Sequence, residues 1–322
     1  MYESIVVRGM DACVRVGDQL RPRSSRHDLR GHGIRTLVLS HSGVTHTAPP
    51  PPAPAPRVGA LLREWRNARR LSQLGLALEA GVSSRHLSYV ETGKAQPSRD
   101  MVARLADTLD VPLRDRNALL MAAGYAPEYP ERSLSTPELA QIRRAIDLIL
   151  GAQEPFPAFV LNRRWDVLHA NRAAARLGVF LVGGRTHSNM ARQFFDPNDM
   201  RSVVVNWEEV AGDLVRHLHD EIAAAPSDTE TAALLDEILR YPGVPPAWRN
   251  RQLGSVPPPL LTAHFRKGDT ELRFFSTITR FGTPRDVTID ELRIECTFPA
   301  DDATAELCRR LARDDPDASA AR

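Results

Sequence analysis

The amino-acid sequence predicts a multidomain fold, with an all-α domain of five helices followed by an α+β domain that contains an antiparallel sheet. Between Val58 and Gly124, apolar residues recur at helical spacing in five segments, each closed by a helix-stop signal. After about Leu150 the pattern changes to short strand-like runs interrupted by helical stretches. A chain of 322 residues is long enough for two independent cores.

The segments outside these domains have no helical or strand periodicity. Residues 1–56 end in a proline-rich run, Pro49 to Pro56, which is typical of an extended spacer. A translation start placed too far upstream is the alternative reading of this segment. We expect a disordered N-terminal tail at 1–56, a helix-turn-helix domain at 57–125, a linker at 126–136, an α+β domain at 137–312 and a disordered tail at 313–322.

Each helix of the first domain has its own signal. The first carries apolar residues on one face, and each of the next three begins at a serine that can cap a helix N-terminus. Glycines or an Asp-Val-Pro sequence separate the later helices. The expected helices are Leu61–Ala68, Ser72–Ala80, Ser83–Gly93, Ser98–Leu109 and Leu113–Ala123.

The second domain is expected to combine two early strands, several helices and three late strands in one antiparallel sheet. The early strands form a hairpin joined by Asn162-Arg163-Arg164. The strands are Ala158–Leu161, Trp165–Ala170, Leu260–Phe265, Glu271–Arg280 and Leu292–Phe298, and the helices are Pro137–Leu150, Met190–Phe195, Val205–Ala225, Thr231–Leu239 and Ala303–Leu311.

Composition and charge narrow the class of protein. No window approaches the roughly 20 apolar residues that a membrane span needs, so no membrane contact is expected. Three widely spaced cysteines favour free thiols in the reducing cytoplasm. Residues 57–99 hold eight basic against three acidic residues, whereas residues 133–322 hold 23 against 27. A basic module joined to a mildly acidic body is typical of a DNA reader attached to another domain.

Two short helices around the tight turn Gly81-Val82-Ser83 form the sequence pattern of a helix-turn-helix. The stretch from Leu71 to Lys94 resembles the XRE family of lambda-repressor-like regulators over about 65 residues. Ser72-Gln73, Leu76-Ala77, Ala80-Gly81-Val82-Ser83, Val90-Glu91 and Gly93-Lys94 all fall at the family spacing. The resemblance implies binding to a double-stranded DNA operator; a helical bundle that uses the motif only for packing is the alternative.

In such motifs the N-terminal end of the second helix reaches base edges in the major groove. Arg85 can bind a guanine bidentately, and Lys94 is placed to meet a backbone phosphate. Gln73 suits either a phosphate or a bracing role, and a solvated surface position is an equal alternative for His86. The candidate DNA-binding residues are Gln73, Ser83, Ser84, Arg85, His86, Tyr89 and Lys94. Glu91 would be repelled by phosphates, and the resemblance instead implies an internal ion pair between Arg66 and Glu91.

The second domain resembles the ligand-binding domain of MmyB-like regulators over most of residues 133–312. The resemblance is carried by the stretches Asn162–Asn171, Asn189–Arg192, Asn206–Val210, Thr277–Pro284 and Asp290–Asp301. It implies a PAS-like sheet around a buried pocket suited to a fatty-acid-like ligand.

Three residues are candidates for the polar end of that pocket. Asn189 and Arg192 lie three residues apart on one helix face, and the guanidinium of Arg192 suits a carboxylate. Asn206 is a weaker third candidate. A structural ion pair, for example with Glu208, is the alternative for Arg192, and helix capping is the alternative for Asn206.

No enzymatic motif is evident. His217 and His219 lie two residues apart, so on a helix they point in different directions and cannot share a metal ion. No nucleophile elbow or glycine-rich nucleotide loop is present, and we expect no catalytic residue, metal or cofactor.

The sequence therefore predicts a DNA-binding transcription regulator that senses a small molecule and acts as a homodimer. A second hypothesis gives the C-terminal domain only protein–protein contacts, as in an antitoxin-like protein. A third is an enzyme with a tethered DNA-binding module.

Overall fold

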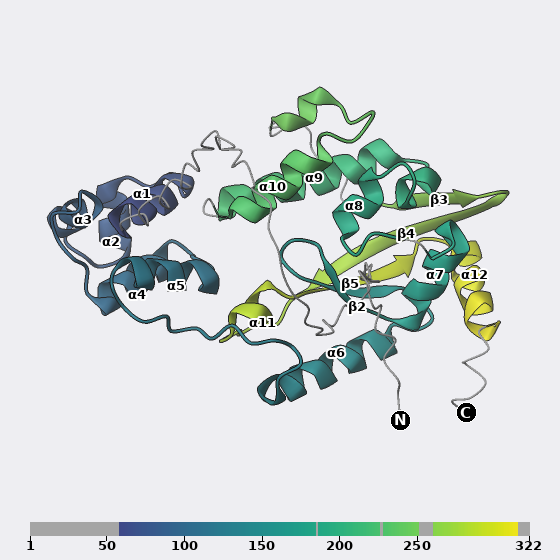
Figure 1. The fold of residues 1–322 in the computed structure, drawn as a ribbon, viewed down its shortest axis with the longest axis horizontal. Helices are drawn as coiled ribbons and strands as arrows, with labels where there is room; N and C mark the ends of the chain where they lie inside the picture. The colour runs from purple at the N-terminus through teal and green to yellow at the C-terminus, as the bar shows by residue number, and fades with distance from the viewer. Residues whose placement is uncertain (1–57, 185, 226–227, 251–259, 315–322) are drawn as a thin grey trace, which may run out of the picture. The chain divides into compact units, whose positions relative to one another are not determined.

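The computed structural model of the chain describes residues 58–184, 186–225, 228–250 and 260–314 (Figure 1). The expected disordered tail at 1–56, with Cys13, lies outside the described residues, as does most of the tail at 313–322. Cys296 and Cys308 are both buried free thiols. None of the described helices is long and apolar enough to cross a membrane.

Five helices form the first domain, as the sequence predicts. They are α1 Val58–Ala68, α2 Gln73–Glu79, α3 Ser84–Glu91, α4 Arg99–Thr108 and α5 Leu113–Ala122. Ser72, Ser83 and Ser98 each accept a backbone hydrogen bond at the start of α2, α3 and α4, which confirms the three expected caps. The helices surround one apolar core that includes Leu62, Trp65, Leu76, Leu87 and Leu105.

The second domain contains a five-stranded sheet of order β2-β1-β5-β4-β3, in which every neighbouring pair is antiparallel. The single antiparallel sheet expected from the sequence is thus confirmed. Each strand lies within three residues of its expected position. The strands are β1 Ala158–Leu161, β2 Val167–Ala170, β3 Ala263–Lys267, β4 Thr270–Thr279 and β5 Arg293–Pro299.

Helices cover both faces of this sheet. The α-helices are α6 Ala140–Ala152, α7 Arg172–Val182, α8 Met190–Phe195, α9 Trp207–Ala224, α10 Thr229–Ile238, α11 Val287–Glu291 and α12 Asp302–Arg313, and the short 3-10 turns are η1 Pro137–Leu139, η2 Met200–Val203 and η3 Pro246–Arg249. Two of these helices, α7 and α11, were not expected from the sequence. Two signals for α7 were present: Asn171 caps its start and Gly183 ends it in the left-handed conformation, with φ of 74°. The apolar run after Gly178 hid its amphipathic pattern.

The alternation of side chains along the strands separates the two faces of the sheet. On one face, Ala158 and Val160 of β1 and Ile294 and Cys296 of β5 pack with residues of α6. On the other face, Phe159 pairs in register with Glu295, and Ile278 pairs with the same glutamate from β4. Figure 1 shows α6 on one side of the sheet and α8 and α9 on the other.

Candidate functional site

The turn between α2 and α3 presents the N-terminal end of α3 to solvent. Gly81 occupies this turn with φ of 62°, a conformation that favours glycine. Ser83 caps α3 by accepting a hydrogen bond from the backbone N–H of His86. Leu87 and Val90 are fully buried, so the opposite face of α3 is left for solvent.

The exposed face of α3 carries most of the predicted DNA-binding residues. Ser83, Ser84, Arg85, His86, Tyr89 and Lys94 are all exposed. Arg85 lies over the ring of Tyr89, with its guanidinium carbon 5.5 Å from the ring centroid, and its Nε donates to the Tyr89 hydroxyl at 3.1 Å. This contact restrains an arginine that otherwise has many rotamers. The arrangement matches a reading helix with an ordered guanidinium.

A buried ion-pair network holds the C-terminal end of α3 against α1. Arg66 on α1 donates to the two carboxylate oxygens of Glu91 at 2.7 and 3.0 Å, which confirms the internal ion pair. Gln73 donates to the same carboxylate at 2.8 Å, so its side chain braces α3 in this structure. Burial by itself raises the pKa of Glu91, but the hydrogen bonds from Arg66 and Gln73 and the nearby positive charges outweigh it, and the pKa is lowered.

Close packing of α1 on α3 reinforces this network. A Cβ atom placed on Gly59 would lie 2.2 Å from the carbonyl oxygen of Val90, which is backbone and cannot move aside cheaply. A glycine at position 59 therefore allows the first turn of α1 to rest directly on the end of α3.

In the second domain, the sheet face opposite α6 forms one wall of a cavity of about 470 Å³. Residues of α7, α8 and α9 form the other walls. This volume lies in the range of small-molecule sites. The apolar part of the lining includes Leu177, Leu181, Phe194, Met200, Phe265 and Phe274.

Polar side chains are grouped within this otherwise apolar lining. The His217 ring lies 6.4 Å from the Trp165 ring, and His217 is hydrogen-bonded to Asp213 one turn earlier on α9. That hydrogen bond raises the pKa of His217 despite partial burial. Burial raises the pKa of Glu295 on β5, and a hydrogen bond from Ser276 only partly opposes the shift. These polar groups belong to five residues that line the cavity: Trp165, Asp213, His217, Ser276 and Glu295.

Comparison with known proteins assigns both domains. Residues 57–119 match a helix-turn-helix domain, and residues 142–311, more than half of the chain, match the MmyB-like transcription regulator ligand binding domain. The chain belongs to the family of MmyB-like transcription regulators.

Two relatives share part of this regulator. The chain is 39% identical over 74 residues to the uncharacterized HTH-type transcriptional regulator RghRB of Bacillus subtilis, covering 23% of this chain and 51% of the relative. It is 36% identical over 116 residues to a putative HTH-type transcriptional regulatory protein of Methanoculleus marisnigri, covering 35% of this chain and 37% of the relative. The chain thus spans about half or less of the length of these relatives.

The three predicted ligand-binding residues are not among those that line the cavity. Asn189 caps α8 and donates to the Arg164 carbonyl and to Asp166. The guanidinium of Arg192 makes two hydrogen bonds with Glu237, at 2.7 and 2.8 Å, so its ion-pair partner is Glu237 and not Glu208. The side-chain amide of Asn206 donates a hydrogen bond to the Thr262 carbonyl and accepts one from the backbone N–H of His264. The polar groups of these three residues are thus bonded to other parts of the chain in this structure. A ligand contact by any of them remains a prediction.

The cavity residues themselves escaped the sequence analysis. Glu295 lies in the strand Leu292–Phe298 that the sequence predicts, in which the polar residues Arg293, Glu295 and Thr297 alternate with apolar ones. The available signal was the period of two: Glu295 alternates with the buried residues Ile294 and Cys296, so it must face away from α6.

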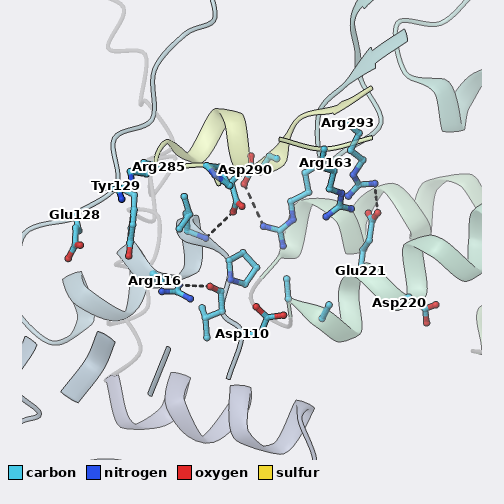
Figure 2. A pocket seen from close by; sticks show the side chains of 18 of the residues that line it. Asp110, Arg116, Glu128, Tyr129, Arg163, Asp220, Glu221, Arg285, Asp290 and Arg293 are labelled. Atoms are coloured by element: carbon cyan, nitrogen blue, oxygen red, sulfur yellow. Dashed lines mark hydrogen bonds and ion pairs between the residues drawn. The ribbon is translucent and has the colours of Figure 1, made fainter. Parts of the chain in front are cut away.

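A polar cleft lies between the helix-turn-helix domain and the ligand-binding domain (Figure 2). Its volume is about 1030 Å³, and charged residues of both signs line it. Arg163, in the β1–β2 turn, lies 3.6 Å from Asp115 of α5 and 3.7 Å from Glu291 of α11. Leu113, the first residue of α5, donates its backbone N–H to Asp290 at 3.1 Å. Pro112 provides no side-chain cap, so a residue of the ligand-binding domain caps a helix of the DNA-binding domain.

His217 and His219 diverge, as their spacing predicts. His217 contacts Asp213, whereas Nε2 of His219 is 2.9 Å from the carbonyl oxygen of Trp248. Within the described parts of the chain, no group of three or more His, Cys, Asp or Glu side chains is arranged to hold a metal ion.

Proposed function

We propose that this regulator is a ligand-responsive repressor or activator in which a small molecule in the 470 Å³ cavity changes the affinity for an operator. The observation that carries the proposal is the β1–β2 turn. Trp165 of this turn lines the cavity, while Arg163, two residues earlier, contacts Asp115 in the helix-turn-helix domain. A shift of the Trp165 ring is therefore coupled through a short segment of backbone to the domain that carries the reading helix.

A second physical connection runs along α9. His217 of α9 lines both the cavity and the polar cleft. Ala225, immediately after the end of α9, is buried in the apolar core of the helix-turn-helix domain. Ligand contact with His217 thus changes how the C-terminal end of α9 packs against the helix-turn-helix domain.

The energetics require only a modest effect. A ligand shifts operator affinity when it has different affinities for the two arrangements of the domains. Couplings of about 1–3 kcal/mol change affinity by roughly 5–150-fold. Between the domains, Arg163 contacts Asp115, Arg114 pairs with Glu291 and Asp290 caps α5, and these are the polar contacts that a change in domain arrangement would have to break.

On DNA, we propose that Ser84, Arg85 and His86 face base edges, with Tyr89 supporting Arg85, and that Ser83 and Lys94 meet phosphates. Gln73 positions α3 through Glu91 and approaches the adjacent backbone. One module contacts too few base pairs for genomic specificity, so we propose a homodimer on two half-sites about one helical turn apart, acting in the cytoplasm.

Native mass spectrometry of the purified full chain tests for a retained small molecule. Operator affinity is then measured with the cavity loaded and after extraction with organic solvent and refolding. A change of at least about fivefold supports the proposal. Equal affinity in the two states, with ligand bound in one of them, would leave the ligand-binding domain without a regulatory role.

The route of coupling is tested by Arg163→Gln. This substitution removes the contacts with Asp115 and Glu291 and also the ion pair with Asp228 at the start of α10, 2.9 Å away. We expect ligand retention and basal operator affinity to persist while the ligand-induced change falls towards onefold. Arg164→Gln is the matched control, because Arg164 is the next residue and pairs with Glu230 in the ligand-binding domain. Equal loss of coupling in both variants would contradict a specific role for Arg163.

A further inference from the structure

Both outer strands of the sheet have edges that other parts of the chain cover. At the edge of β2, Val167 donates its backbone N–H to the Ser188 carbonyl. At the edge of β3, Val204 forms a bridge with Phe265. Such coverage is usual in folded proteins, because an exposed strand edge carries backbone groups that can pair with another chain.

The C-terminal half of β4 forms a third edge of the sheet. β4 continues to Thr279, whereas its pairing with β3 ends where Ala263 meets Phe274 (Figure 1). Beyond Phe274, β5 is the only strand among the described residues that pairs with β4. The residues of β4 from Ser276 onward are exposed. This part of β4 therefore lacks the cover that the outer strands have.

The backbone groups that face this edge belong to Ser276 and Ile278. In an antiparallel pair, successive residues direct their N–H and C=O groups to alternate edges of the strand. The Arg273 carbonyl accepts from the backbone N–H of Ala300, directly after β5. Every second residue from Arg273, including Thr277, therefore faces β5, and Ser276 and Ile278 present their N–H and C=O groups to the open edge.

A continuation of β3 is poorly suited to pair with this edge. Leu261 and Thr262 lie within the described residues but outside β3. Extending the β3–β4 register would bring Pro259 opposite Ile278, and proline has no N–H to donate to the Ile278 carbonyl.

The edge is instead complementary to a second copy of itself. Residues 274–279 contain no charged side chain, so a two-fold pairing brings no like charges together. If Thr277 lies opposite Thr277 of the second copy, Ser276 comes opposite Ile278, and these two residues exchange N–H···O=C hydrogen bonds in both directions. Pairs of threonines across antiparallel strands are themselves stabilising.

We propose that the regulator dimerises by antiparallel pairing of the β4 edge about a two-fold axis at Thr277, which joins the two sheets into one. Ser276 and Ile278 also line the cavity, so Ile278 of the second copy lies beside the cavity wall. The interface is small, so we expect a micromolar dissociation constant that binding to two DNA half-sites reinforces. This inference rests on the proposed function, which takes the regulator to be a homodimer.

The test is sedimentation velocity of the full-length chain at about 1–100 µM, with charges placed on the proposed axis. Thr277→Lys and Thr277→Glu each bring like charges together and should raise the dissociation constant at least about tenfold. An equimolar mixture of the two variants brings opposite charges together and should return the constant to within about threefold of the parent value.

The side chain of Thr277 is suited to this test because it is exposed and is not among those that line the cavity. Circular dichroism melts check that the variants are folded. Thr186→Lys adds the same charge at an exposed loop position of the same domain, and this control should leave the dimer unchanged.

Amide hydrogen exchange of the parent chain gives a second measurement if the variants do not fold. The Ser276 and Ile278 amides should gain protection as the protein concentration rises, whereas the Thr277 amide, which faces β5, is protected throughout. Full protection of Ser276 and Ile278 at the lowest concentration would show that the chain covers its own edge. Rapid exchange of both amides in the dimer would place the interface elsewhere. Either result would overturn the inference.

The outcomes separate this inference from the function on which it rests. If the parent chain dimerises and both Thr277 variants dimerise equally well, or if their mixture does not recover, the β4 edge is refuted and the homodimer stands. If the parent chain stays monomeric even on its operator, the homodimer of the proposed function fails as well.

Discussion

Two glutamates with buried carboxyl oxygens show how differently the two domains are built. Glu91 in the helix-turn-helix domain accepts hydrogen bonds from Arg66 and Gln73, and its pKa is lowered. Glu295 in the ligand-binding domain has an unpartnered oxygen, and burial raises its pKa. One carboxylate completes a scaffold within the chain, whereas the other is left incomplete at the wall of a cavity.

This difference matches the tasks of the two domains. A reading helix must be held rigidly so that its exposed side chains keep their register on DNA. A ligand that binds only the folded ligand-binding domain would instead add to its stability.

We expect Glu91→Gln to have the largest effect, because it disrupts the ion pair that holds α3 in the helix-turn-helix domain. The substitution leaves the buried Arg66 without a charged partner, so we expect a loss of about 3 kcal/mol in the free energy of unfolding at neutral pH. Because the folded-state pKa is lowered, the stabilisation by Glu91 is present above its ordinary value of 4.5 and is lost as the pH falls through the folded value. Denaturant unfolding from about pH 3 to pH 7 measures this, with the exposed Glu79→Gln as the control. A constant difference across that range would contradict an ion-pair origin.

Arg85→Ala tests whether the rigid scaffold serves base reading. We expect a loss of about 1–3 kcal/mol in binding to the operator and relaxed specificity at one base pair. Gel-shift titrations on the operator and on its single-base variants measure both effects. Arg104→Ala removes an equal charge from the exposed surface of α4 and should leave discrimination intact. Unchanged discrimination in Arg85→Ala would mean that another part of α3 faces the bases.

Lys94→Ala should have a different signature on the same surface. A phosphate contact carries no sequence information, so affinity should fall about equally for operator and random DNA. The slope of log affinity against log salt concentration should decrease by about 1. A loss confined to the operator would move Lys94 into the base-reading group.

Arg192→Ala tests the ligand anchor that the sequence predicts, which is not among the residues that line the cavity. The Arg192 and Glu237 side chains are 34% and 41% exposed, so their pair should contribute no more than about 1 kcal/mol. Binding of the uncharged fluorophore N-phenyl-1-naphthylamine, a probe for the apolar cavity, should be unchanged, as measured by fluorescence titration beside a thermal melt. Lost fluorophore binding with an unchanged melting temperature would restore Arg192 as the ligand anchor.

Glu295→Gln should give the smallest effect, with a pH dependence opposite to that of Glu91→Gln. Above pH 4.5 the unfolded chain ionises at this residue while the folded chain, whose pKa is raised, keeps the proton. Stability attributable to Glu295 therefore falls as the pH rises towards the folded value. We expect the free energy of unfolding of Glu295→Gln to equal that of the parent protein near pH 4 and to exceed it near pH 8. Greater stability of the parent at pH 8 would show that Glu295 has a charged partner.

The sequence by itself determined the helical domain almost completely. Ser72, Ser83 and Ser98 cap their helices through contacts three residues away, and local spacing specifies such contacts. The candidate DNA face followed from the same spacing, because positions that share one face of a helix are buried or exposed together.

Only the tertiary structure decided the cavity in the ligand-binding domain and the partners of the residues around it. Arg192 pairs with Glu237, 45 residues away, and Glu295 on β5 accepts from Ser276 on the neighbouring strand β4. Neither contact can be predicted from a local sequence pattern. Spacing along α8 placed Asn189 and Arg192 on one face, but it carried no information on what that face would meet. Caps and periodicity depend on neighbours within one turn of helix, whereas a cavity is the space left between elements that are distant in the chain.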